Sequence, residues 1–218
     1  MNGVLEIYSK LKEGEPMKKG VATIRKVNVT EDEANYSNIR YIIKDKKFMC
    51  IRSGQYIILD IKGKGIMMSD TPMEKRTNKD FVKKANGRVF IAGLGIGLII
   101  HNLKSKIQSG EVSEIVVFEL EQDVIDLVAP YFQNEKIKII KQDIFQYEPK
   151  PDDVFDTIYF DIWETISDDN LDEMLFLHEK WKDNLNKENK RSFIDSWLKK
   201  YLEEERKKEL NFYEIGRK

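Results

Sequence analysis

The chain has 218 residues, of which 41% are hydrophobic and 11% aromatic, so it can bury a core and is not a disordered tail. Charged residues make up 34% of the sequence but cancel to a formal net charge of −1, which gives no general attraction to nucleic acid or to membranes. A single cysteine, Cys50, excludes an intramolecular disulfide, and the N-terminus shows no signal-peptide pattern. We therefore expect a soluble, cytoplasmic protein with one principal domain and a small addition.

Residues 1–68 predict an N-terminal segment followed by a small antiparallel β domain. Residues 1–20 are polar and rich in lysine, and we expect them to wrap the surface. Short segments rich in β-branched and aromatic residues follow, separated by turn-forming clusters such as Ser53–Gly54. The predicted strands of this meander are Val21–Val29, Ile39–Ile43, Phe48–Ile51, Gln55–Asp60 and Gly65–Met68.

Residues 69–87 form a predicted connector with a short helix at Lys79–Ala85. Pro72 and the capping-type residues Ser69, Asp70 and Asn78 indicate a turn before that helix. Two interpretations remain open. The connector either lines the mouth of an active site or is an ordinary capped linker.

Strands and helices alternate over residues 88–218. The predicted strands are Val89–Ala92, Ile115–Phe118, Ile137–Ile140, Thr157–Phe160 and Ser192–Ile194, and the predicted helices are Leu98–Ile107, Gln122–Tyr131, Asp169–Leu185 and Asp195–Leu210. Such interleaving is typical of an α/β, Rossmann-like, doubly wound parallel sheet.

Three glycines follow the first of these strands at alternate positions, namely Gly93, Gly95 and Gly97. A strand, a tight glycine turn and a helix N-terminus together favour a bound nucleotide-like cofactor. The dinucleotide pattern needs its third glycine at position 98, where this chain has Leu98, so the spacing argues against NAD. The alternative is that the glycines only allow the helix to pack closely on the strand.

Acidic residues follow three consecutive predicted strands, at the sheet edge where ligands bind in such folds. Glu119 can accept both ribose hydroxyls of an adenosine cofactor, and Asp143 can accept a hydrogen bond from the adenine amino group. Asp161 follows the next strand, close to the expected position of a reactive sulfonium. Any one of the three could instead be a helix cap or a surface acid.

These motifs, over about residues 65–163, resemble the spermidine-synthase-like branch of the class I S-adenosylmethionine-dependent methyltransferase superfamily. The similar motifs are the glycine turn Gly93–Gly97, the ribose motif Phe118–Glu121, the adenine motif Gln142–Ile144 and the fourth motif Phe155–Asp161. The resemblance implies S-adenosylmethionine, or its decarboxylated form, as cofactor. It also implies a homodimer, since the family often dimerises.

Two departures from the family pattern affect the expected reaction. The glycine turn has Ile96 where aminopropyltransferases usually have aspartate, and Asp161 is followed by Ile162–Trp163 rather than by a second acid with proline. Methyl transfer is therefore favoured over aminopropyl transfer. After Ser192–Ile194 one long helix ends the pattern, so we expect a parallel sheet truncated at its C-terminal end.

Asp161 is the expected catalytic residue, orienting or deprotonating an amine or hydroxyl nucleophile. Trp163 either contacts the substrate or packs, while Asp70 and Glu74 are lesser candidates for contacts with substrate or with the methionine part of the cofactor. Asp195 either faces the pocket or caps the last helix. His101 and His178 have no partners at ligand spacing, so we predict no metal site.

Three functions therefore remain open. The first is a methyltransferase acting on a small-molecule amine or hydroxyl, the second an aminopropyltransferase using decarboxylated S-adenosylmethionine, and the third a non-catalytic cofactor-binding module. We expect a small-molecule substrate, no membrane partner, and no nucleic acid, because no basic stripe with interleaved aromatic residues is present.

Overall fold

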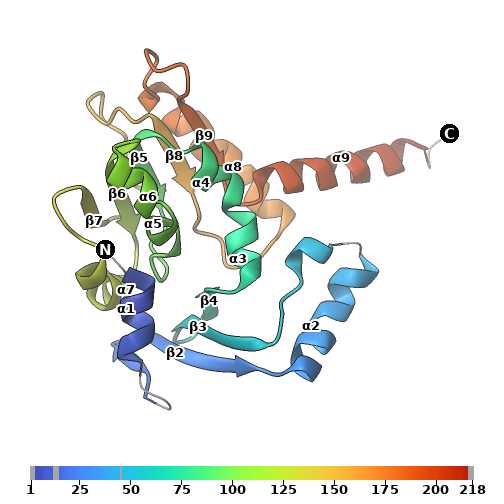
Figure 1. Cartoon of the computed structure of the whole chain (residues 1–218). Helices are drawn as coiled ribbons and strands as arrows, with labels where there is room; N and C mark the ends of the chain where they lie inside the picture. The colour runs from blue at the N-terminus through green and yellow to red at the C-terminus, as the bar shows by residue number, and fades with distance from the viewer. Residues whose placement is uncertain (1–2, 12–14, 45, 216–218) are drawn as a thin grey trace.

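The computed structural model describes residues 3–11, 15–44 and 46–215, which form two β-sheets with helices packed around them (Figure 1). Parts of the predicted N-terminal segment (1–2 and 12–14) and of the predicted last domain (216–218) lie outside the described residues. Within the described ranges, every helix is too short or too polar to cross a lipid bilayer.

The first sheet is antiparallel, with the strand order β1–β2–β3–β4. Its strands are β1 (Met17–Lys19), β2 (Ala22–Val29), β3 (Gly54–Ile61) and β4 (Gly65–Ser69). The side chains of Ile57, Leu59 and Ile61 alternate into the main hydrophobic core, as the two-residue period of a strand requires. The predicted small antiparallel sheet is confirmed, together with the strands predicted at 21–29, 55–60 and 65–68.

The strand predicted at Ile39–Ile43 is wrong, because this run lies in helix α2 (Glu31–Ile43). The Thr30 hydroxyl accepts the N–H of Glu33, and the Glu33 carboxylate accepts the N–H of Thr30. This reciprocal capping box and an acidic first turn favour the helix over the β propensity of the isoleucines. The strand predicted at Phe48–Ile51 is also wrong, since its first residues lie in the 3-10 turn η1 (Lys47–Met49).

The connector between the sheets contains two short helices, α3 (Pro72–Thr77) and α4 (Lys79–Lys84), where the sequence predicted one. Asn78, between the two helices, is buried and its side-chain oxygen accepts a hydrogen bond of 2.7 Å from the Tyr159 hydroxyl. Phe81 stacks on the Tyr159 ring with 3.9 Å between the centroids. The connector is therefore held against the strand that carries Tyr159.

The second sheet is parallel throughout its described strands, in the order β7–β6–β5–β8–β9. The strands are β5 (Gly87–Ala92), β6 (Val112–Glu119), β7 (Ile137–Lys141), β8 (Thr157–Phe160) and β9 (Phe193–Ser196). The chain reverses its direction of travel across the sheet between β5 and β8, which is the switch point where such sheets bind ligands. The predicted Rossmann-like fold is confirmed.

Alternate residues of β5 enter two different cores, one on each face of the parallel sheet. Val89 and Ile91 belong to the core that includes Leu103 and the antiparallel sheet, whereas Phe90 and Ala92 belong to a core that includes Trp181. Both faces are apolar, as expected for a parallel sheet covered by helices on both sides.

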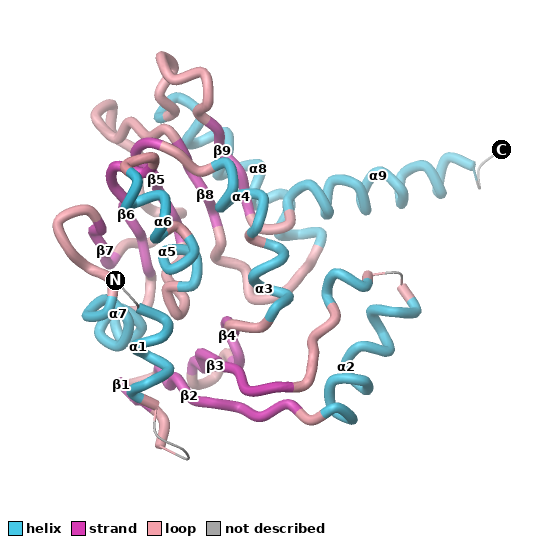
Figure 2. Tube along the Cα trace, in the orientation of Figure 1, coloured by secondary structure: helices cyan, strands magenta, loops and turns pink. Residues whose placement is uncertain are grey.

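The helices around the parallel sheet are α5 (Leu98–Asn102), α6 (Lys104–Ser109), α7 (Gln122–Val128), α8 (Asp168–Trp181) and α9 (Lys199–Ile215), with the 3-10 turns η2 (Ala129–Tyr131) and η3 (Lys182–Asn184). Helix α1 (Gly3–Lys10) buries Val4 and Ile7 in the main core instead of lying loosely on the surface. Helix α9 begins beside α8, where Leu202 packs on Leu171 and Met174. Its far end extends away from both sheets (Figures 1 and 2).

Phe90 lies at the centre of an aromatic cluster in the core that includes Trp181, and its substitution tests the packing of that core. Its ring is fully buried and stacks on Trp181 with 4.4 Å between the centroids. We expect Phe90→Ala to lower the free energy of unfolding by about 3–5 kcal/mol, because it removes buried apolar area and leaves a cavity. Urea denaturation measures the change. Phe176→Ala, at a side chain that is 54% exposed, is the control and should cost less than about 1 kcal/mol.

Candidate functional site

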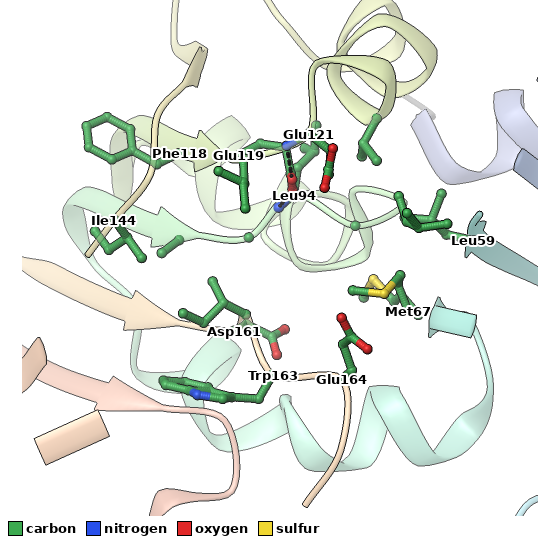
Figure 3. A pocket seen from close by; sticks show the side chains of 18 of the residues that line it. Leu59, Met67, Leu94, Phe118, Glu119, Glu121, Ile144, Asp161, Trp163 and Glu164 are labelled. Atoms are coloured by element: carbon green, nitrogen blue, oxygen red, sulfur yellow. Dashed lines mark hydrogen bonds between the residues drawn. The ribbon is translucent and has the colours of Figure 1, made fainter. Parts of the chain in front are cut away.

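A cavity of about 310 Å³ lies at the carboxyl ends of β5, β6 and β8, and residues of the antiparallel sheet and of α3 also line it (Figure 3). Leu59, Ile61, Met67 and Met68 line it from β3 and β4. From the parallel sheet and its loops, the lining includes Gly93, Gly95, Glu119, Asp143, Asp161 and Trp163. With Glu74 from α3, seven residues singled out in the sequence therefore meet in one pocket.

The glycine turn follows β5 and has left-handed backbone conformations at Gly93 (φ +99°) and Gly95 (φ +51°). A Cβ atom on Gly93 would lie 2.1 Å from the carbonyl oxygen of Asp161, and one on Gly95 would lie 2.1 Å from the Met68 sulfur. Gly97 has φ +76° at the start of α5, and a Cβ there would meet the ring of Phe132 instead of the pocket. The first two glycines of the turn therefore allow close approaches at the pocket, and the third allows α5 to pack against Phe132.

Glu119 ends β6, and its carboxylate is fixed by the backbone. One oxygen accepts the N–H of Leu94 and the other accepts the N–H of Glu121, both at 2.9 Å (Figure 3). Burial raises the pKa of Glu119, while these backbone hydrogen bonds oppose the rise. Each carboxylate oxygen can accept more than one hydrogen bond, so the group can still bind two hydroxyls of a ligand.

Asp143 lies beyond β7 and lines the pocket beside Ile144. One carboxylate oxygen accepts the N–H of Phe145 at 2.8 Å, which holds the side chain in a tight turn. Phe118 and Ile144 line the neighbouring wall (Figure 3). A flat apolar surface with an acceptor at its edge suits a planar ring that carries an amino group.

Asp161 and Glu74 bring two carboxyl groups to the same end of the pocket. Asp161 follows β8, and burial raises its pKa to about 7. Glu74 reaches the pocket from α3, where burial and the nearby charge of Asp161 raise its pKa to about 8. Within the described residues, neither carboxyl forms an ion pair with a basic side chain, so a cation at this end of the pocket would stabilise their charged forms.

Asp70 and Asp195 lie outside the lining of the pocket. An Asp70 oxygen accepts the N–H of Ile57 at 2.7 Å and so ties the end of β4 to β3. Asp195 lies within β9, where its side chain accepts the N–H of Ser196 at 2.9 Å. Both carboxylates bond to the backbone in this structure.

Trp163 lines the pocket two residues beyond Asp161 (Figure 3). Its indole N–H donates a hydrogen bond of 2.7 Å to the Glu173 carboxylate on α8, and its ring is half-buried against the cores on both sides of the sheet. The two interpretations of this residue are therefore compatible, because a fixed indole can pack on one side and contact a ligand on the other.

Glu121, the last residue of the ribose motif, also lines the pocket, and the sequence did not indicate several further lining residues: Lys64, Met67, Met68, Glu164 and Trp197. Lys64 is the one basic side chain among the described lining residues, and its ammonium lies 2.8 Å from the Glu121 carboxylate. The lining carries six carboxyl groups in all, those of Glu74, Glu119, Glu121, Asp143, Asp161 and Glu164. Such a pocket favours a ligand with positive charge.

The two histidines take no part in the pocket. His178 Nε2 lies 2.8 Å from the Ser196 hydroxyl, and burial lowers the pKa of His178 to about 4. Burial also lowers the pKa of His101. Across the described ranges, no three His, Cys, Asp or Glu side chains are arranged to hold a metal ion.

No protein-family model and no curated protein matches the chain. Similar solved structures include a methyltransferase from Podospora anserina bound to S-adenosylhomocysteine, with 15% identity and a TM-score of 0.40 over 55% of this chain and 50% of that one. An S-adenosylmethionine-dependent methyltransferase from Mesorhizobium loti is also similar, with 14% identity and a TM-score of 0.36 over 50% of this chain and 49% of that one. Another from Clostridium acetobutylicum has 16% identity and a TM-score of 0.35 over 54% of this chain and 48% of that one. The match spans about half the length of these structures.

Gly93→Ala tests the close approach of β5 to β8. We expect it to lower the free energy of unfolding by at least about 2–3 kcal/mol, because the new Cβ meets the Asp161 carbonyl and φ is left-handed. Gly110→Ala is a matched control with φ +80° and nothing within 4 Å of the new Cβ. It should cost only the conformational strain, about 1–2 kcal/mol in urea denaturation. Equal losses in the two variants would contradict the close approach.

Glu74→Gln tests the raised pKa of the carboxyl pair. An acid whose pKa is raised by folding loses stability as pH rises from its unfolded value of about 4.5 to its folded value of about 8. The variant should therefore match wild type near pH 4 and exceed its free energy of unfolding by about 1–2 kcal/mol at pH 8. Denaturation at a series of pH values measures the difference. A difference that is independent of pH would contradict the shift.

Proposed function

We propose that the chain binds S-adenosylmethionine and transfers its methyl group to a small-molecule amine or hydroxyl. The observation that carries this proposal is the meeting of the glycine turn, Glu119, Asp143 and Asp161 in one cavity at the switch point of the sheet. In this proposal Glu119 accepts the ribose hydroxyls, while Asp143, beside Phe118 and Ile144, holds the adenine. The acid-rich lining suits the positive sulfur.

When bound, the sulfonium supplies an electrophilic methyl carbon whose bond to sulfur breaks as the acceptor attacks, leaving a neutral thioether. Asp161 then takes the proton that the acceptor's nitrogen or oxygen loses. Its pKa of about 7 is near the operating pH, as a general base requires. Glu74 and Trp163 hold the acceptor beside Asp161, and positioning supplies much of the rate.

Aminopropyl transfer from decarboxylated S-adenosylmethionine is the second candidate, in line with the resemblance to spermidine synthases. The observation that favours it is the shortage of basic groups for the α-carboxylate of S-adenosylmethionine. Lys64 is the one basic side chain among the described lining residues, and Glu121 already holds it. A pocket so acidic favours a cofactor that lacks the carboxylate.

Calorimetric titration with S-adenosylmethionine, its decarboxylated form and NAD separates these functions. We expect S-adenosylmethionine to bind and Glu119→Ala to weaken binding by about 1–3 kcal/mol, the usual cost of losing a charge-assisted hydrogen-bonding partner. Glu114→Gln is the control, because Glu114 lies on the same strand, pairs with Arg88 and lies outside the lining. It should bind like wild type.

Each outcome of this titration distinguishes between the proposed functions. Binding of the decarboxylated compound alone would replace methyl transfer by aminopropyl transfer, and binding of neither sulfonium compound by folded protein would overturn both. If S-adenosylmethionine binds, a panel of amines and alcohols tests turnover, and Asp161→Asn should lower the rate by about 10²–10⁴-fold, the usual contribution of a general base. Cofactor binding without turnover across the panel would leave a binding module.

A further inference from the structure

Helix α2 carries an apolar stripe that points away from the protein. Tyr36, Ile39 and Ile43 are 81%, 52% and 78% exposed and recur at the spacing of one helix face. Ile42, at 53% exposed, extends the stripe at its edge. Large aliphatic and aromatic side chains exposed together in water mark an interaction surface.

The opposite face of α2 attaches the helix to the protein. Ala34 and Asn38 are buried, and Asn38 hydrogen-bonds the backbone of Ile51 as both donor and acceptor. At 100° per residue, the stripe of Tyr36, Ile39 and Ile43 lies about half a turn away from this attached face. No segment in the described part of the chain covers it, and Figure 1 shows α2 at the margin of the molecule.

Charge is distributed unevenly along the same helix. Glu31 and Asp32 are exposed in its first turn, and Lys44 is exposed directly after its last residue. If two copies of α2 lie antiparallel, the acidic turn of each meets the basic end of the other, and their helix dipoles also oppose. A parallel arrangement would place like charges together.

We infer that the α2 stripe is a self-association surface, on which a second copy of the chain packs its own α2 antiparallel across a twofold axis. In this arrangement Tyr36 of each copy packs beside Ile39 of the other, and Ile43 lies near the first turn of the partner helix. The charges of the surface are self-complementary, as a twofold interface requires. It lies apart from the pocket and does not depend on the proposed transferase activity.

Sedimentation velocity over a wide concentration range tests the apolar stripe. Wild-type protein should show a reversible monomer–dimer equilibrium, and the double variant Ile39→Glu/Ile43→Glu should raise the dimer dissociation constant at least about 100-fold, because it places four charges in the interface. Leu5→Glu is the matched control, since Leu5 is 60% exposed on a different helix. It should dimerise like wild type. Circular dichroism checks that each variant is folded.

A charge swap tests the antiparallel direction. The variant Glu31→Lys/Asp32→Lys and the variant Lys44→Glu should each dimerise about tenfold less tightly than wild type, since each places like charges together at both ends. An equimolar mixture of the two should form a heterodimer of wild-type strength, because both ends are then complementary.

Three results would overturn the inference. The first is a wild-type protein that stays monomeric at every concentration. The second is a dimer that the stripe variant leaves intact. The third is single charge variants that dimerise like wild type, which would exclude the antiparallel pairing. A monomer that instead co-sediments with anionic lipid vesicles through the stripe would assign the surface to a membrane.

Discussion

The contact between β4 and the glycine turn is the interaction on which the pocket depends. The Met68 sulfur accepts the N–H of Ile96 at 3.4 Å and lies where any side chain on Gly95 would have to go. The antiparallel sheet thereby closes a cavity that the parallel sheet alone would leave open. The Lys64–Glu121 ion pair and the hydrogen bond from the Val21 N–H to Asp123 join the antiparallel sheet to the turn after β6 and to α7. A thioether is a soft, adaptable group, so this wall can adjust to a ligand.

Acidic groups in the pocket are kept at a cost in stability. Burial raises the pKa values of Glu74, Asp161 and Glu119, which means that folding disfavours their charged forms. A core built only for packing would place apolar residues at these positions. The carboxyl groups become an advantage only when a cation or a set of hydroxyls enters the pocket. The buried carboxyl groups, whose charged forms folding disfavours, and the cavity beside them both indicate a ligand-binding site.

The sequence predicted the parallel sheet and indicated the glycines and strand-end acids that line the pocket, because these follow from local patterns. Apolar runs that end in Gly93, Glu119 and Asp161 are strands whose carboxyl ends must meet. The strand predicted at the isoleucines of α2 was wrong because their β propensity is outweighed by the capping box of Thr30 and Glu33, which begins a helix. Glu74 was only a lesser candidate and Trp197 was not indicated at all, since their positions depend on how α3 and the end of β9 pack in three dimensions.

Tyr159 and Asp161 lie two residues apart at the end of β8, and Tyr159 is fastened to the connector through Asn78 and Phe81. Glu74 belongs to α3 of that connector, which Arg76 also attaches to the carbonyl oxygens of Phe48 and Cys50. The antiparallel sheet contributes neither Glu74 nor Asp161. The spacing of the two acids is therefore set by α3 and the end of β8, and the strands of the antiparallel sheet line the pocket without setting that spacing.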